Sequence, residues 1–199
     1  MIEKFLTEVL FFLVLVNPVS KIFILHILSK NTGKNDMRKV MIKSSFVALI
    51  ILISFCFAGT FILQDVFHIS VESLQVAGGL VLVSVGYTAL KKGVFFEVDT
   101  DQKLADMAIV PIASPIIAGP ATMTASIVES SVYGPWFVSA ALFTALVINF
   151  SIMYFSKSIT DTLNRFNVSG ALIRITGLFI ASIGMEMILR GIKNFFGIP

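Results

Sequence analysis

The chain has 199 residues, of which 56% are hydrophobic and 14% are charged. Soluble domains carry about 25% charged residues, so this composition excludes an ordinary soluble domain and predicts an integral membrane protein. The formal net charge of +3 says little about nucleic acid, because in a membrane protein the position of the charges matters more than their sum. The single cysteine, Cys56, excludes a disulfide framework and a cysteine metal site.

Six apolar stretches are long enough to cross a bilayer, since about 20 consecutive apolar residues span its hydrocarbon core as a helix. We expect an all-α integral membrane protein in which six transmembrane helices form a single membrane domain, residues 1–199. The expected spans are residues 5–29, 41–63, 70–90, 108–129, 135–156 and 169–189. We expect residues 9–16 to be retained in the first span, because no small-x-small cleavage site follows them.

The basic residues predict the orientation of the chain in the membrane. Ten lysines and arginines fall in the first, third and fifth connections, and only three, Lys4, Arg190 and Lys193, fall on the opposite side. Because cytoplasmic connections carry the excess of basic residues, both termini are expected outside.

The two halves of the chain resemble each other. A shift of 98 residues superposes Gly79-Leu80 on Gly177-Leu178, Ser84-x-Gly86 on Ser182-x-Gly184, and Lys92-Gly93 on Arg190-Gly191. Each half holds three spans, an odd number, so the second copy must be inserted upside down. We therefore expect a 3+3 inverted repeat of residues about 1–95 and 96–199, with the second half inverted relative to the first.

The first span contains a helix-start signal near its middle, Asn17-Pro18. Asparagine is a preferred N-cap and proline is favoured at the first helical position. Asn17 lies about 14 residues after Glu3, or roughly 21 Å at the helical rise, past the middle of a hydrocarbon core about 30 Å thick. The pattern predicts a discontinuous first helix, with the N–H groups of Val19 and Ser20 just behind the break.

The fourth span is interrupted in the same way, by Pro111, Ser114-Pro115 and Gly119-Pro120. The N–H groups of Ala121 and Thr122 follow the last of these. With the 98-residue shift Pro18 falls within one residue of Pro115. Interrupted spans at corresponding places in two halves are a pointer to the substrate site of a transporter.

In an inverted repeat the two new helix starts face a common point near the middle of the membrane. Free N–H groups and the positive end of the helix dipole bind anions, so a carboxylate there needs no arginine. The hydroxyls of Ser20, Thr122 and Thr124 could add donors, the Asn17 amide could reach a substrate group, and the small residues leave a small cavity. A small zwitterion fits this chemistry. Purely structural proline kinks are the alternative. The predicted substrate-binding residues are Asn17, Pro18, Val19, Ser20, Ser114, Pro115, Gly119, Pro120, Ala121 and Thr122.

Charged residues inside spans are functional candidates. Lys21 could hold a substrate carboxylate or pair with Glu129 or Glu186; alternatively its long side chain extends to the interface. Glu186 is expected to form an i,i+4 pair with Arg190, with proton binding as the alternative. Arg174 lies near the cytoplasmic end, where a structural role is favoured.

Glycines mark the expected close contacts between helices. Small residues let transmembrane helices approach closely, and Gly78, Gly79 and Gly177 are the expected contact positions. A part in a rocking motion is secondary to this packing role.

These motifs resemble those of the MarC family of six-span inner-membrane proteins of bacteria and archaea. The resemblance covers essentially the whole chain and rests on residues 15–19 (LVNPV), 77–79 (AGG), 110–115 (VPIASP), 118–120 (AGP), 174–177 (RITG), Gly184 and Glu186. It implies transport of small neutral amino acids, glycine and alanine among them. It also implies discontinuous first and fourth helices around the substrate and a place in the prokaryotic inner (plasma) membrane.

The chain departs from the family pattern at four positions near the presumed site. The family commonly has glycine at Ser20 and Ala121, proline at Phe23 and arginine at Gln75, and Lys21 is an unusual charge. The candidate coupling or gating residues are Lys21, Gln75, Gly78, Gly79, Arg174 and Glu186.

The expected function is that of a secondary transporter that moves a small zwitterionic amino acid by alternating access. The alternatives are an exporter or channel for another small solute or ion, or a non-transporting membrane protein. An intramembrane enzyme is not expected, because the chain lacks a His-Glu-x-x-His motif and His26 is only a weak candidate base. We expect no cofactor, no metal site and no nucleic-acid partner. The expected coupling ion is a proton or sodium, and a homo-oligomer stays open.

Overall fold

The computed structural model describes residues 2–29, 34–95, 118–165 and 168–197, and every regular element in these ranges is a helix. Five of the described helices are long and apolar enough to cross a membrane: Ile2–Ile22, Arg38–Val66, Val71–Lys92, Pro135–Tyr154 and Ser169–Phe195. The expected all-helical, multi-pass membrane architecture is confirmed at this level. The first half of the expected fourth span, together with Ser114 and Pro115, lies outside the described residues.

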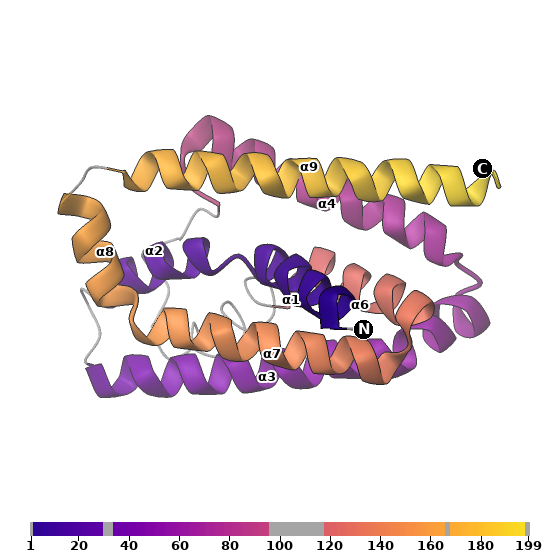
Figure 1. The fold of residues 1–199 in the computed structure, drawn as a ribbon, viewed down its shortest axis with the longest axis horizontal. Coiled ribbons are helices and arrows are strands. Elements are labelled where there is room, and N and C mark those ends of the chain that lie inside the picture. The colour runs from indigo at the N-terminus through magenta and orange to yellow at the C-terminus, as the bar shows by residue number, and fades with distance from the viewer. Residues whose placement is uncertain (1, 30–33, 96–117, 166–167, 198–199) are drawn as a thin grey trace.

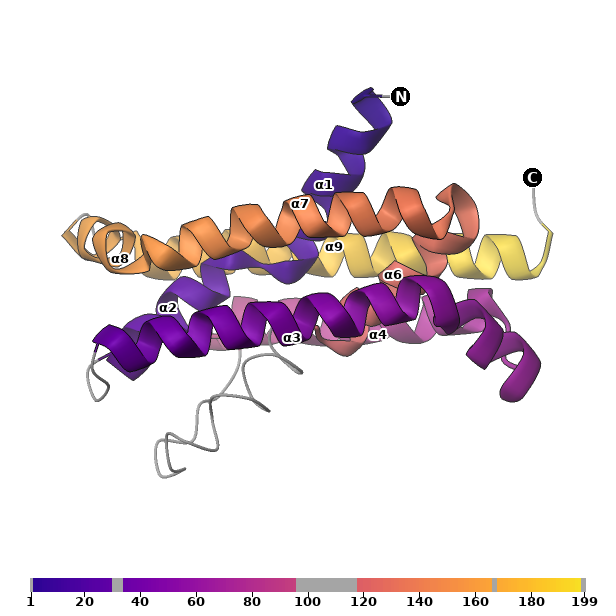
Figure 2. The ribbon, with the colours of Figure 1, turned by 90° about the horizontal axis from the view of Figure 1, so that it is seen from below.

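The elements follow the expected spans closely. They are α1 (Ile2–Val16), α2 (Pro18–Ser29), α3 (Lys34–Phe61), a turn of π-helix η1 (Ile62–Val66), α4 (Val71–Lys92), α6 (Pro120–Tyr133), α7 (Pro135–Tyr154), α8 (Ser156–Arg165) and α9 (Ser169–Phe195). Figure 1 shows α3, α4, α7 and α9 running along the long axis of the molecule, with α8 across one end. Figure 2 shows α1 leaning out of this bundle toward its N-terminal end.

Local sequence sets several helix ends. Ser70 caps α4, because its hydroxyl accepts the N–H of Ser73 at 3.1 Å. Gly93 ends α4 with a φ of 69°, which an L side chain rarely adopts. Gly134, with a φ of 86°, separates α6 from α7, and Pro135 takes the first position of α7.

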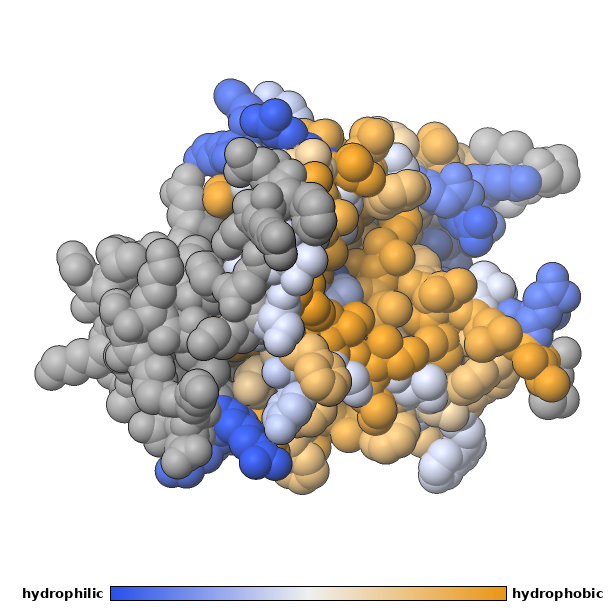
Figure 3. Space-filling view, turned by 60° about the vertical axis from the view of Figure 1, so that its left-hand side comes forward, coloured by the Kyte–Doolittle hydropathy of each residue, from blue (hydrophilic) through white to orange (hydrophobic). Residues whose placement is uncertain are grey.

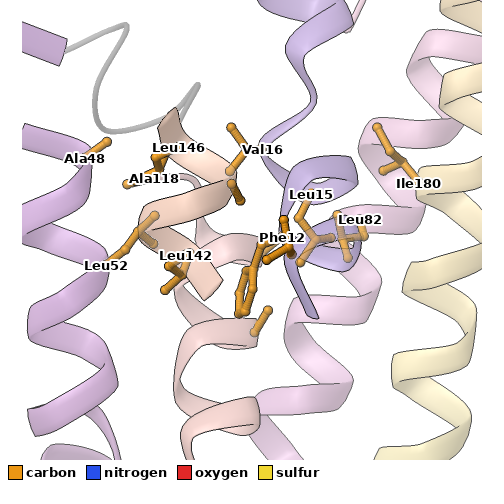
Figure 4. Packing of buried hydrophobic residues seen from close by; sticks show 14 of the residues in the cluster. Phe12, Leu15, Val16, Ala48, Leu52, Leu82, Ala118, Leu142, Leu146 and Ile180 are labelled. Atoms are coloured by element: carbon orange, nitrogen blue, oxygen red, sulfur yellow. The ribbon is translucent and has the colours of Figure 1, made fainter. Parts of the chain in front are cut away.

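Apolar side chains fill the interior and also cover the outside. Phe12, Leu52 and Leu142 are fully buried within one cluster (Figure 4). Large apolar side chains such as Phe46 on α3 and Phe179 on α9 are more than half exposed. Figure 3 shows a broad hydrophobic surface with polar side chains gathered at its borders. An apolar surface of this extent fits contact with lipid rather than with water.

α4 and α9 form the most extensive contact between described elements, and glycines line it. A Cβ on Gly79 would lie 2.5 Å from the carbonyl oxygen of Gly184, and a Cβ on Gly86 would lie 2.5 Å from that of Gly177. The two antiparallel backbones therefore touch directly, as small residues in membrane helices permit. The packing role expected for Gly79 and Gly177 is confirmed.

The glycine contacts join the two halves of the chain. The 98-residue shift that aligns the halves turns Gly79 into Gly177 and Gly86 into Gly184. Each glycine packs against the counterpart of the other, Gly79 on Gly184 and Gly86 on Gly177. A two-fold relation between two helices would bring the same surface of each into contact. The 3+3 repeat of the complete halves stays a prediction.

Gly184→Ala is expected to destabilise the protein by about 1–3 kcal/mol, because the added methyl would overpack a rigid contact. The methyl would lie 2.6 Å from the carbonyl oxygen of Gly79. Thermal unfolding of the purified protein in detergent measures this effect. Gly170→Ala is the matched control, since a Cβ at Gly170 on the same helix meets nothing within 4 Å. Equal unfolding midpoints for the two variants would contradict the packing role.

Candidate functional site

Two successive helices meet at Asn17. Asn17 has a φ of 54°, a left-handed conformation that asparagine tolerates better than most residues. Its side-chain Oδ1 accepts the N–H of Ser20 at 3.2 Å, and the Ser20 hydroxyl donates to the Asn17 carbonyl at 2.8 Å. Asn17 thus ends α1 and caps α2, and both Asn17 and Ser20 are buried.

The start of α6 has the same hydroxyl-to-cap hydrogen bond but lacks the side-chain cap. Gly119 is the N-cap in an extended conformation and Pro120 takes the first helical position. The Thr122 hydroxyl donates to the Gly119 carbonyl at 2.9 Å. Both helix starts therefore follow one pattern, in which a cap is followed by proline and then, three residues after the cap, by a hydroxyl residue that bonds back to the cap.

The difference between the two starts matters for ligand binding. Asn17 supplies a side-chain cap to α2, whereas Gly119 has no side chain and nothing of its own caps the first turn of α6. The first N–H groups of a helix lack partners within the helix, and a helix start can therefore bind an anion.

The hydroxyls of Ser20 and Thr122 have roles that the sequence analysis did not anticipate. Each donates its proton to a backbone carbonyl, so each presents its oxygen lone pairs rather than its proton to a ligand. A hydroxyl residue three positions after a cap is the sequence signal that could have indicated this. In this arrangement the two hydroxyls suit an ammonium better than a carboxylate.

Both helix starts border the buried core. Val16, the last residue of α1, and Ala118, just before the cap of α6, belong to the large cluster of buried side chains that runs through the described helices (Figure 4). Ala121 is buried in this cluster as well, and Thr122 is 2% exposed. Pro18 and Val19 are half-buried at the start of α2, and Pro120 is exposed.

Gly78 lets α4 approach α6 close to the second break. A Cβ on Gly78 would lie 2.5 Å from the Cγ2 atom of Thr124. Gln75, one turn earlier on α4, is also buried. Gly78 therefore belongs to the contact between α4 and α6, while its neighbour Gly79 contacts α9.

Lys21 is the most unusual buried side chain of the described part. It is 1% exposed, and its Nζ has no hydrogen-bond partner. The suggested pairs with Glu129 and Glu186 do not form, and the side chain does not extend to the surface. Because helical side chains lean toward the N-terminus of their helix, Lys21 leans toward the break at Asn17.

Two further buried polar atoms lie on elements that pack against α2. The Oδ1 of Asn149 on α7 and the Oγ1 of Thr160 on α8 lack hydrogen-bond partners, and both α7 and α8 contact α2. Buried polar groups normally have partners. Unpartnered polar atoms on three mutually packed elements mark this region as one that a polar ligand or water could complete.

The expected pair between Glu186 and Arg190 is confirmed. The Arg190 Nε donates to the Glu186 Oε1 at 2.6 Å, and both side chains are more than half exposed. Arg174 is exposed near the start of α9, in keeping with a structural role near the membrane surface.

Two acidic residues were not among the candidate site residues: Glu8 on α1 was missed, and Glu129 on α6 was considered only as a partner of Lys21. Glu8 is 7% exposed, and its Oε2 has no hydrogen-bond partner. An acid within an apolar helix is the sequence signal that could have found both. Among the residues that the structure describes, no group of three or more His, Cys, Asp or Glu side chains could hold a metal.

The fold and the apolar surface define an integral, multi-pass membrane protein. The chain belongs to the MarC family: the model of the MarC family integral membrane protein matches residues 2–196. A UPF0056 membrane protein of Pyrococcus horikoshii is 32% identical, over 96% of this chain and 94% of its own. One from Methanocaldococcus jannaschii is 28% identical, over 90% and 91%. No solved structure matches significantly.

Asn17→Ala is expected to destabilise the protein by about 2 kcal/mol, because it removes a cap and leaves an alanine in the left-handed conformation. Asn17→Gly removes the cap but tolerates that conformation, and should cost only a few tenths of a kcal/mol. Thermal unfolding of the two variants separates the effects. Equal losses would show that the positive φ is unimportant.

Proposed function

We propose that this chain is a secondary transporter of small neutral amino acids such as glycine and alanine, working by alternating access. The observation that carries the proposal is the pair of like helix starts, Asn17-Pro18-x-Ser20 and Gly119-Pro120-x-Thr122, each beside the buried core. Interrupted helices near the middle of the membrane are the usual substrate site of such transporters.

In this proposal the two ends of a zwitterion find different partners. Its carboxylate takes N–H groups at the start of α6, where Gly119 supplies no side-chain cap. Its ammonium donates to the oxygens of Ser20 and Thr122, whose protons are already used. The small side chains of Ala118 and Ala121 suit a compact substrate.

The proposed architecture is a 3+3 inverted repeat with discontinuous first and fourth helices. The like helix starts, the 98-residue similarity and the glycine contacts of α4 with α9 support it. We place both termini outside the prokaryotic inner membrane, because ten basic residues lie in the three connections on the other side. Ser114 and Pro115 would complete the site.

Lys21 favours a second candidate, transport of a small solute with net negative charge. A buried ammonium without a partner costs free energy, and an anionic solute would supply the missing partner. This candidate differs from the first in substrate charge, so flux measurements distinguish them.

The direct test is flux of radiolabelled glycine and alanine in proteoliposomes. The wild type is expected to exchange both, and Gly119→Leu is expected to abolish the exchange by filling the space at the start of α6. Gly170→Leu is the matched control, because a Cβ at Gly170 meets no atom within 4 Å. Absence of flux in the correctly inserted wild-type protein would contradict the proposed substrates, and succinate and lactate would then test the anionic candidate.

Lys21→Met separates the two roles of Lys21. If Lys21 binds a substrate carboxylate, the variant should lose about tenfold or more in apparent affinity, the value of one hydrogen bond to a charged group. Without substrate its unfolding midpoint should stay equal or rise, because an unpaired buried charge is removed. Lys43→Met, at an exposed position on α3, is the control. Unchanged affinity would exclude Lys21 from the substrate site.

A further inference from the structure

Glu8 is a buried carboxylate that the proposed substrate site does not use. It lies in the middle of α1, nine residues before the break at Asn17. It is 7% exposed, and its Oε2 has no hydrogen-bond partner. An ionised carboxylate in such a place is costly unless a cation or a proton accompanies it.

A second carboxylate, Glu129 on α6, faces the same region. Glu129 lies one turn before Tyr133 on α6, and Tyr133 lines a pocket together with Glu8. α1, which carries Glu8, contacts both α6 and α9. On α9 the Arg190 Nε is bonded to Glu186 at 2.6 Å.

The remaining charged and titratable groups around Glu8 do not neutralise it. α7, which packs against α1, carries no Asp, Glu, Lys, Arg or His between Pro135 and Tyr154. Tyr133 at the end of α6, and Glu3 and Lys4 on α1 itself, are exposed. No described side chain forms an ion pair with Glu8.

A pocket connects Glu8 with the surface near the N-terminus. It has a volume of about 240 Å³ and is lined by Glu3, Lys4, Thr7, Glu8 and Tyr133. Three of these side chains are both polar and exposed, namely Glu3, Lys4 and Thr7. Water can therefore reach the neighbourhood of Glu8 from the side on which the N-terminus lies.

We propose that Glu8 and Glu129 form a proton-binding pair that couples substrate movement to protons. Two like charges close together in an apolar site cannot both ionise cheaply, so one proton binds a carboxylate oxygen and is released again as the carboxylate ion forms. A proton suits the pair better than a hard metal cation, which takes several oxygen ligands. The coupling part rests on the proposed transport function, whereas proton binding does not.

The first measurement is labelling of the full-length protein by dicyclohexylcarbodiimide, an apolar reagent that reacts with protonated carboxyl groups. Peptide mass mapping follows labelling at Glu8, Glu129 and Glu186 as the pH rises. Glu8 or Glu129 is expected to stay reactive at least about one pH unit, or tenfold in proton activity, beyond the exposed Glu186. Glu129→Gln should move the loss of Glu8 labelling to lower pH, because the second negative charge is gone. Labelling equal to that of Glu186, or insensitive to Glu129→Gln, would overturn the proton pair.

The second measurement is flux driven by an imposed pH gradient in proteoliposomes. Glu8→Gln and Glu129→Gln are expected to exchange substrate but to lose the response to the gradient, while Asp65→Asn, a control at an exposed position on η1, keeps it. Retention of the response in the Gln variants, or a response to sodium instead of protons, would overturn the coupling role. Absence of any flux in the wild type would refute the proposed transport function instead, and the labelling result would still decide proton binding.

Discussion

Inside a bilayer, a helix break is possible only where the backbone groups that it frees find partners within the protein. The two helix starts of this chain meet that constraint with very few residues. Asn17 turns the chain with a positive φ and caps α2 with its own side chain, while Ser20 bonds back to the Asn17 carbonyl. At the other start Gly119 and Thr122 satisfy the carbonyl side only. In the proposed function, the start of α6 binds the substrate carboxylate, because Gly119 supplies no side-chain cap.

A helix that stops inside the membrane loses part of its own stability, so each helix start needs packing against neighbouring helices. α4 and α9 form a closely packed pair for this purpose, with their backbones in direct contact at Gly79 and Gly86. Gly78 then brings α6 against α4 through Thr124, so the start of α6 is tied to the most extensive helix contact of the described part. α2, in contrast, packs mainly on α7 and α8. α2 and α6 thus attach to different parts of the bundle, which is compatible with the proposed alternating access.

The sequence predicted the helices well because lipid imposes a simple rule on length and composition. It also predicted both helix starts, since Asn-Pro and Gly-Pro are local signals. It did not predict the direction of the hydroxyl bonds of Ser20 and Thr122, although their spacing from the caps is readable. The burial of Lys21 could not be predicted, because it depends on α7 and α8, which lie more than 100 residues away in the chain. The placement of Glu8 relative to Glu129 likewise depends on the packing of α1 against α6, so no local sequence pattern predicts it.

The buried charges of α1 and α2 lie on opposite sides of the break at Asn17. Glu8 precedes Asn17 on α1 and Lys21 follows it on α2, so carboxylates lie on one side of the break and an ammonium on the other. Each charge alone costs stability in an apolar environment. Together they produce a field across the break that attracts a cation toward Glu8 and Glu129 and an anion toward Lys21, the charge that the second candidate substrate carries. Protonation of the acidic pair would weaken this field. That dependence gives a physical reason why proton binding on one side of the break could change the affinity for substrate at the break itself.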